Sequence, residues 1–191
     1  SSTLTTNEDY GQSLSFSLSD VEDSALALQI ESNASNGVVS ISGSDVIYTP
    51  TLNYNGSDSF IVSTTDSNGA KVTQIINVTV ASINDIPTIT IDSTLTTNED
   101  NETSLSFTFN DVDGDTVSAS EKVAPTNGVI SIAGTTITYT PTPNYNGSDS
   151  FTITLTDNAG YSTDKTITVS VTSVNDIPII TINSTLSTDE D

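Results

Sequence analysis

Carboxylate side chains gather in the turns of this chain rather than along its strand-like segments. One turn holds Asp20 and Glu22, a richer one is Asp111-Val112-Asp113-Gly114-Asp115, and two later turns hold Asp66 and Asp157. Several oxygen ligands offered by irregular loops suit a hard cation such as Ca²⁺. The turns therefore predict cation binding. Acidic loops that carry no ion and only keep the protein soluble are the alternative.

The charge balance and the residues that are absent exclude several kinds of chemistry. The 191 residues include 25 acidic side chains against 3 basic ones, a net charge of −22, with no Cys and no His. Nucleic acids and anionic membranes need a basic face, so we expect neither as a partner. Without Cys or His there is no disulfide, no thiolate nucleophile and no usual zinc ligand. Paired carboxylates could hydrolyse glycosides, but none has the concave apolar setting that this requires, so we expect no enzyme.

The chain contains an internal repeat. The stretch Ser2–Asp9 recurs letter for letter as Ser93–Asp100, an offset of 91 residues, and the same offset carries 53–60 onto 144–151. A third copy begins at Ser184. A period this long indicates complete small domains in tandem rather than solenoid turns. We therefore predict one repeat at 1–85, a second at 86–176, and the start of a third at 177–191.

Apolar residues alternate with polar ones in short runs separated by turns. Ser13–Ser19 has an apolar residue at every second position, which predicts one half-buried strand after a polar lead at 5–9. The runs at 39–41 and 46–48 flank Ser42-Gly43-Ser44 and predict a hairpin. About seven such runs per repeat, with no helical period, predict an all-β, antiparallel sandwich.

In a sandwich of this kind the loops gather at its two ends. Counting strands places the first acidic turn and the late acidic turn at the same end, which faces the junction before the repeat. Carboxylates crowded together there cannot all stay ionised without a cation. The turn at 111–115 is similar to the start of a calcium loop, but the helices and the distal Glu of an EF-hand are absent.

Taken together, several motifs resemble the bacterial cadherin-like tandem repeats of large surface adhesins and secreted proteins, over the whole chain. The motifs are Asn98-Glu99-Asp100, the turn at 111–115, Tyr139-Thr140-Pro141, the stretch 144–151, and Val174-Asn175-Asp176-Ile177-Pro178. The resemblance implies two tandem cadherin-like, Ig-like Greek-key β-sandwich domains. It also implies an extracellular location, on a bacterial surface or secreted.

The resemblance further implies Ca²⁺ between consecutive repeats, held by an early Glu of one repeat, the linker, and two turns of the next. For the junction inside this chain the implied ligands are Glu8, Asn84, Asp85, Asp111, Asp113 and Asp157. The implied half-sites toward a preceding repeat are Asp20, Glu22 and Asp66, and those toward a following repeat are Glu99, Asn175 and Asp176. Ser82 and Ile86 stand where the family linker has further polar ligands, which implies fewer ions per junction.

These features favour a calcium-rigidified extender or stalk of an adhesin, whose partners are the neighbouring repeats of the same chain. Surface polysaccharide or protein ligands would be contacted through other domains, without membrane insertion. The alternative is a carbohydrate- or protein-binding adhesion module. Sugar sites present aromatic platforms, whereas this chain has no Trp and 6 Tyr. Of these, we expect Tyr54 and Tyr145 to pin their loops.

Overall fold

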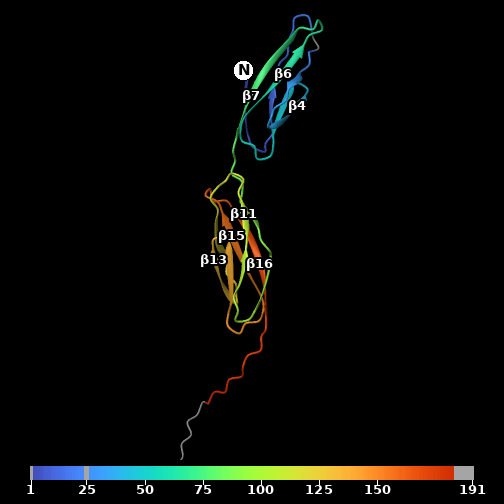
Figure 1. Ribbon diagram of the computed structural model, residues 1–191. Helices are drawn as coiled ribbons and strands as arrows, with labels where there is room; N and C mark the ends of the chain where they lie inside the picture. The colour runs from blue at the N-terminus through green and yellow to red at the C-terminus, as the bar shows by residue number, and fades with distance from the viewer. Residues whose placement is uncertain (1, 24–25, 183–191) are drawn as a thin grey trace, which may run out of the picture. The chain divides into compact units, whose positions relative to one another are not determined.

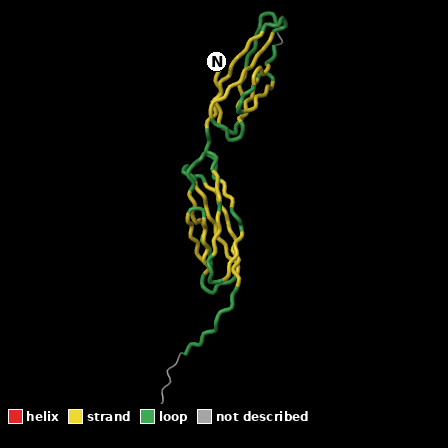
Figure 2. Tube along the Cα trace, viewed as in Figure 1, coloured by secondary structure: helices red, strands yellow, loops and turns green. Residues whose placement is uncertain are grey.

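The computed structural model describes residues 2–23 and 26–182, and these form strands and loops without a helix (Figures 1 and 2). The chain divides into two compact units, Ser1–Asn84 and Asp85–Asp191. The third copy predicted from Ser184 onward lies outside the described residues. None of the described residues forms a helix long and apolar enough to cross a membrane.

The first unit contains seven strands in two sheets. One sheet has the order β1-β7-β6-β3 and the other the order β2-β5-β4. The strands are β1 (Ser2–Asn7), β2 (Gln12–Ser15), β3 (Gln29–Ser32), β4 (Gly37–Ser42), β5 (Asp45–Pro50), β6 (Gly56–Thr65) and β7 (Lys71–Ala81). The predicted hairpin is confirmed as β4 and β5, which pair antiparallel from Gly37 opposite Pro50 to Ser42 opposite Asp45.

The second unit repeats this plan with two strands interrupted. Its sheets have the orders β12-β15-β16-β9, β10-β14-β13 and β11-β8. The strands are β8 (Thr88–Thr90), β9 (Thr94–Asn98), β10 (Thr103–Ser106), β11 (Thr108–Asn110), β12 (Ser118–Val123), β13 (Gly128–Ala133), β14 (Thr136–Pro141), β15 (Gly147–Thr156) and β16 (Ser162–Thr172). β8 and β9 are two parts of one edge strand that pairs first with β11 and then with β16.

Each unit has its own apolar core between its sheets. In the first unit, alternate residues of β5, β6 and β7 point inward, and the rings of Tyr48 and Phe60 stack with centroids 6.2 Å apart. In the second unit Tyr139 and Phe151 repeat the stack at 6.2 Å. The inward residues come from both sheets, so the sheets pack face to face. The prediction of an all-β, Ig-like sandwich is confirmed.

Three details of the predicted strands are wrong. The polar lead is strand β1, because its β-branched threonines suit a strand and Leu4 turns inward to the core. That strand runs parallel to β7, and β9 runs parallel to β16, so the sandwich is not wholly antiparallel. The strand predicted at Ser13–Ser19 ends at Ser15. In the second unit the equivalent strand breaks at Phe107, whose N–H bonds to Thr135 O, because β10 pairs with β14 while β11 pairs with β8.

Candidate metal centre at the acidic turns

The richest acidic turn follows β11 in the second unit. Its backbone folds back so that the N–H of Asp115 donates to Asp111 Oδ1 at 3.0 Å. Gly114 makes the bend possible, because its φ of 76° lies in the left-handed region that side-chain-bearing residues avoid. The turn therefore brings Asp115 back beside Asp111.

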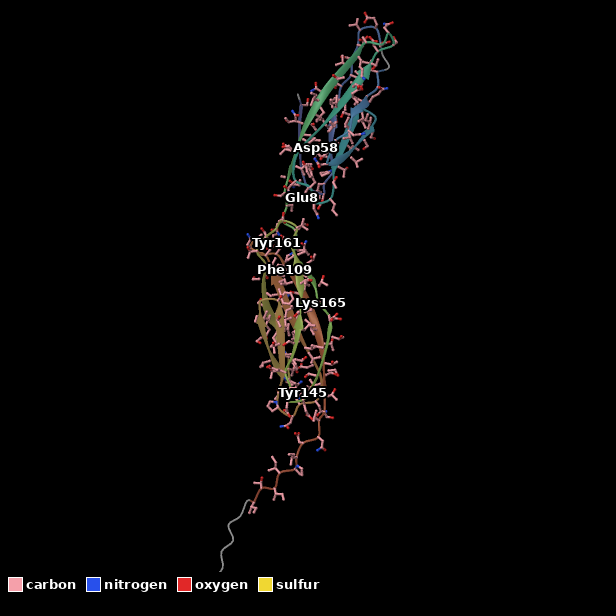
Figure 3. All side chains as sticks on the ribbon, in the orientation of Figure 1. Glu8, Asp58, Phe109, Tyr145, Tyr161 and Lys165 are labelled. Atoms are coloured by element: carbon pink, nitrogen blue, oxygen red, sulfur yellow. The ribbon has the colours of Figure 1, made fainter. Side chains whose placement is uncertain are left out.

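The late turn after β15 meets this first turn. With the Asn158 amide oriented so that its nitrogen faces Asp115, Nδ2 lies 3.0 Å and 2.5 Å from the two carboxylate oxygens. The pKa of Asp115 is raised, by burial first and then by the charges of Asp111, Asp157 and Asp113. The expectation that the two acidic turns share one end of the sandwich is confirmed. Figure 3 shows Tyr161, which follows the late turn, and Tyr145 at opposite ends of this unit.

One carboxylate of this cluster and one oxygen of another are withdrawn from water. Asp157 is 5% exposed, and its Oδ1 accepts a bond from the N–H of Tyr161 at 2.8 Å. Asp111 Oδ2 is buried without a hydrogen-bond partner among the described residues. An ionised oxygen without a partner is costly at a buried position. A cation beside Asp111 would offset that cost.

The linker residue Asp85 belongs to the same end of the second unit. Its backbone N–H donates to Asp113 Oδ2 at 2.7 Å. The structure therefore brings together four of the six residues predicted for the junction, namely Asp85, Asp111, Asp113 and Asp157.

The other two predicted junction residues lie in the first unit. Glu8 is 2% exposed, and its Oε1 accepts a bond from the N–H of Ile83 at 2.5 Å, next to the half-buried Asn84. Figure 3 shows Glu8 at the end of the unit where β7 runs into the linker. The turn after Glu8 is held by Asp9, whose Oδ1 accepts a bond from the N–H of Asn53 at 2.7 Å.

The corresponding end of the second unit has the same construction. Glu99 is buried, and its Oε1 accepts a bond from the N–H of Val174 at 2.5 Å. Asn175 and Asp176, which follow, are exposed, and Asn175 Nδ2 donates to the backbone oxygen of Asp176 at 3.0 Å.

The acidic turns of the first unit use different bonds. Asp20 Oδ1 accepts the N–H groups of Glu22 and Asp23, both at 2.9 Å, and Asp66 Oδ1 accepts those of Asn68 and Ala70. The two turns are joined because the Asp23 carboxylate accepts bonds from the N–H of Ser67 at 2.7 Å and from its hydroxyl at 2.9 Å. These bonds lower the pKa of Asp23. The first unit thus joins its turns through Asp23, at the position where the second unit has Gly114.

Sequence reasoning missed the role of Asp58 and Asp149. Asp149 is buried and accepts bonds from the N–H groups of Thr126, Asn127 and Ser150 and from the hydroxyl of Tyr139 at 3.0 Å. Asp58 makes the same four kinds of bond in the first unit. The signal that could have found it is the invariance of Asp within the duplicated stretch at 53–60 and 144–151. Two partners of Asp149, Thr126 and Asn127, lie more than 20 residues away, so spacing could not identify them.

The donor set fits a hard cation, but carboxylates alone do not complete a site. Among the described residues, no three or more Asp and Glu side chains converge closely enough to hold a metal ion by themselves. Calcium takes six to eight oxygens and accepts amide oxygens, backbone carbonyls and water. The residues fit calcium if such ligands join the carboxylates of Asp111, Asp113 and Asp157.

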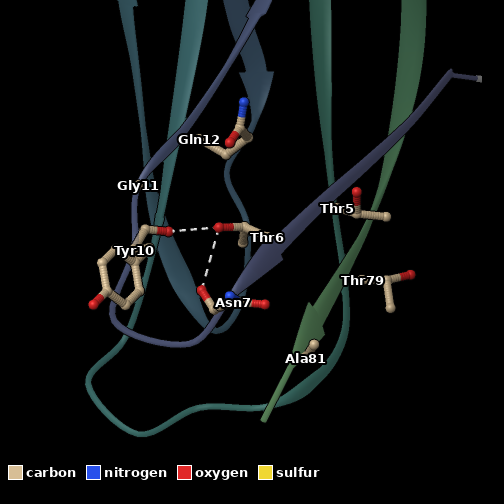
Figure 4. A pocket seen from close by; sticks show the side chains of 8 residues that line it. All are labelled: Thr5, Thr6, Asn7, Tyr10, Gly11, Gln12, Thr79 and Ala81. Atoms are coloured by element: carbon tan, nitrogen blue, oxygen red, sulfur yellow. Dashed lines mark hydrogen bonds between the residues drawn. The ribbon is translucent and has the colours of Figure 1, made fainter. Parts of the chain in front are cut away.

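A hollow of the first unit lies beside the end of β1 that leads to Glu8. It encloses about 490 Å³ and is lined by Thr5, Thr6, Asn7, Tyr10, Gly11, Gln12, Thr79 and Ala81 (Figure 4). The Thr6 hydroxyl donates to the backbone oxygen of Tyr10 at 2.8 Å and lies 3.2 Å from that of Asn7. The Tyr10 ring is exposed, and the second repeat has Asn101 at its place.

Comparison with known proteins adds a family and a fold. A family model described as the bacterial Ig domain matches residues 1–79 and again residues 84–170. No curated protein matches the chain. Similar solved structures include protocadherin gamma B2 extracellular cadherin domains 3–6 and Drosophila N-cadherin EC1–4. Both are 16% identical with a TM-score of 0.56, and the matches cover 92% of this chain but 46% and 48% of theirs.

An endo-fucoidan hydrolase, MfFcnA4 from glycoside hydrolase family 107, also matches at 20% identity, over 91% of this chain and 28% of its own. Its TM-score of 0.38 is too low to support an argument. This chain spans less than half the length of these solved chains. At such identities the cadherin matches show the fold alone, a tandem pair of cadherin-like sandwiches.

Proposed function

The chain belongs to the bacterial Ig domain family, and from that premise we propose that it is part of a calcium-stiffened stalk of an extracellular adhesin. Two Ig-like domains in tandem, each with its own core, suit a spacer because every domain has the same task. The proposed location is a bacterial surface or the secreted state. The proposed partners are the neighbouring repeats. The proposal assigns no catalytic activity.

The observation that carries the proposal is the carboxylate cluster of the second unit. Burial, and after it the nearby charges of Asp111, Asp157 and Asp113, raise the pKa of Asp115. One oxygen of Asp111 is buried without a hydrogen-bond partner among the described residues. Mutual repulsion of this kind destabilises the folded domain unless a cation intervenes. We assign Ca²⁺ to this cluster, with Asp85, Asn84 and Glu8 as the further ligands.

The protein's own bonds restrain the linker on both sides. Glu8 holds the N–H of Ile83 within the first unit, and Asp113 holds the N–H of Asp85 within the second. Only Asn84 stands between these two residues. A bound Ca²⁺ would supply attraction between carboxylates that otherwise repel each other.

A calorimetric calcium titration of the whole chain tests the proposal. We expect binding to the wild-type protein and its loss on replacing Asp111 and Asp113 by Ala. The matched control is Asp20→Ala with Glu22→Ala, which changes the equivalent turn of the first repeat and should leave binding at the junction intact. Equal calcium binding by both double variants would contradict the assignment, and absence of binding by the wild type would end it.

The alternative function is carbohydrate binding, and the hollow around Tyr10 is the feature that favours it. Hydroxyl and amide groups line this hollow beside an exposed aromatic ring, which is the usual chemistry of a sugar site. A glycan array with Tyr10→Ala as the control tests it. Binding that disappears in the variant would support this function.

A further inference from the structure

Strand β13 forms one edge of its sheet in the second unit. The sheet has the order β10-β14-β13, so within the described residues no strand pairs with the far side of β13. The N–H of Thr142, just after β14, donates to the oxygen of Asn127, just before β13, at 2.8 Å. Because bonded and non-bonded residue pairs alternate along antiparallel strands, Ile130 and Ile132 direct their backbone N–H and C=O groups away from β14. These groups are positioned to bond to an added strand.

One edge of the other sheet of this unit is protected against such pairing. Its edge strand β12 is bulged between Glu121 and Val123, and it carries the charges of Glu121 and Lys122. Bulges and charged side chains are the usual means by which proteins prevent a strand edge from pairing with another chain. β13 has neither a charged residue nor Pro, and its register with β14 is unbroken. The edge at β13 is therefore open to strand addition.

The sheet that contains β13 is also uncharged. The chain has no charged residue from Val123 to Ser148, a stretch that contains β13 and β14, and β10 has none either. The whole protein carries a net charge of −22, so two copies repel each other. A second copy can approach an uncharged edge at a lower electrostatic cost. The first unit is less suited, because Asp45 lies opposite the last residue of β4, where the second unit has Thr136.

We propose that β13 pairs antiparallel with β13 of a second copy of this chain, about a two-fold axis at Ser131. Each Ser131 then lies opposite its own counterpart, Ile130 lies opposite Ile132, and Val129 lies opposite Ala133. In this register the outward backbone groups of Ile130 and Ile132 face each other, as hydrogen bonding requires. Val129, which is 65% exposed in the single chain, gains an apolar neighbour. The two copies use the same surface, so the contact closes as a dimer.

Sedimentation equilibrium of the 191-residue chain in EDTA tests the proposal without any role for calcium. The paired strands are short, and small interfaces bind weakly, so the measurement extends to about 0.5 mM protein. We expect a monomer–dimer equilibrium that strengthens as sodium chloride is raised, because salt screens the repulsion between the two copies. A monomer at every protein and salt concentration would overturn the proposal.

Charge variants at Ser131 test the two-fold register. Ser131→Lys should weaken dimerisation by about fivefold, because two like charges then lie opposite each other, although the variant lowers the net negative charge. Ser131→Asp should also weaken it, whereas an equimolar mixture of the two variants should associate. The matched control is Ser170→Lys, which is exposed on β16 between β15 and β9, where no strand can add. Equal weakening by Ser170→Lys, or a mixture that associates no better than either variant alone, would overturn the proposal.

Cross-linking gives an independent test, because the native chain has no Cys. The proposed register places the two Ser131 residues in a non-hydrogen-bonded pair, in which opposite side chains lie closest. Ser131→Cys should therefore form a disulfide-linked dimer under mild oxidation, and Ser170→Cys should form far less of it. Equal cross-linking at the two positions would show that the copies meet without a defined contact, and the proposal would fail.

Discussion

The carboxylate of Glu8 accepts a hydrogen bond from the backbone N–H of Ile83, a residue 75 positions further along the chain. Glu99 and Val174 repeat this bond in the second unit. Both glutamates are buried, and each lies in the turn after the strand that pairs parallel with the last strand of its unit, β1 with β7 and β9 with β16. Each glutamate therefore holds the chain at the point where that last strand ends. Each repeat thus holds the first residues of the linker that follows it against its own end.

Replacing Glu8 by Ala should separate this structural role from calcium binding. The Ile83 N–H would lose its partner, so we expect the first unit to lose about 1–3 kcal/mol in urea unfolding. Glu99→Ala should cost the second unit a similar amount. Only Glu8→Ala should also weaken calcium binding at the junction. Identical calcium titrations for the two variants would remove Glu8 from the ligand set.

Asp149 should be the most important carboxylate for the stability of the second unit. In Asp149→Asn an amide NH₂ group replaces one of the two carboxylate oxygens. That group faces the N–H donors of Thr126 and Ser150 if it replaces Oδ1, or the N–H of Asn127 if it replaces Oδ2. We therefore expect the free energy of unfolding to fall by about 2–3 kcal/mol. Asp58→Asn is the matched change in the first unit and should cost less, because Asp58 is only half-buried. Urea unfolding measures both. A larger loss for Asp58→Asn would contradict this account.

Both aspartates also predict how stability depends on pH. Burial alone would raise the pKa of Asp58 and of Asp149, but their bonds from backbone N–H groups and from Tyr48 or Tyr139 lower it below the ordinary value. A carboxyl group whose pKa is lower in the folded than in the unfolded protein stabilises the folded state at any pH above its unfolded-state pKa, near 3.8 for Asp. This stabilisation is lost as the pH falls through the folded-state pKa.

We therefore expect acid unfolding below about pH 4, where these carboxylates take up protons. The raised pKa of Asp115 acts in the opposite direction, because its protonation removes a charge that burial disfavours and that the neighbouring carboxylates repel. The double variant Asp58→Asn with Asp149→Asn should be less stable at pH 7 and should lose stability less steeply in acid. Circular dichroism from pH 7 to pH 2, at a fixed urea concentration, measures this. An unchanged acid slope would show that other carboxylates control it.

Gly128 should be far less tolerant of Ala than Gly134. A Cβ at Gly128 would lie 2.6 Å from the Tyr139 ring and 2.8 Å from the Thr140 carbonyl, so we expect a loss of up to about 3 kcal/mol. At Gly134 a Cβ meets nothing within 4 Å, and the cost of about 1 kcal/mol comes only from its φ of 60°. Thermal unfolding measures both. Equal losses of stability in the two variants would mean that Tyr139 and the hairpin of β13 and β14 move aside for the added Cβ without cost, and would contradict this prediction.

Much of the fold could be predicted because the decisive signals are local. Alternation and a central Gly identified the hairpin of β4 and β5, and the expected pinning of loops is confirmed by Tyr54 and Tyr145, which each donate to a backbone oxygen at 2.6 Å. Non-local features were missed. Strand β8 lies in what reads as a linker, because only its pairing with β11 makes it a strand.

The candidate site was predictable to a similar degree. Sequence reasoning identified Asp111, Asp113 and Asp157 from residue type and strand count, and the structure brings them together. Sequence reasoning did not find that Asp23 joins the two acidic turns of the first unit, or that Asp115 joins those of the second. These bonds depend on the late-turn residues that face the two carboxylates, Ser67 in the first unit and Asn158 in the second. Nor could spacing reveal that Glu8 bonds to Ile83.

Small-angle scattering of the whole chain, with calcium and with EDTA, tests the central claim most directly. Calcium at the junction should increase the maximum dimension and reduce the flexibility of the two-unit chain, and Asp111→Ala with Asp113→Ala should abolish the change. A scattering profile that is the same with and without calcium, over concentrations that saturate any binding seen by calorimetry, would contradict the claim that calcium stiffens this protein.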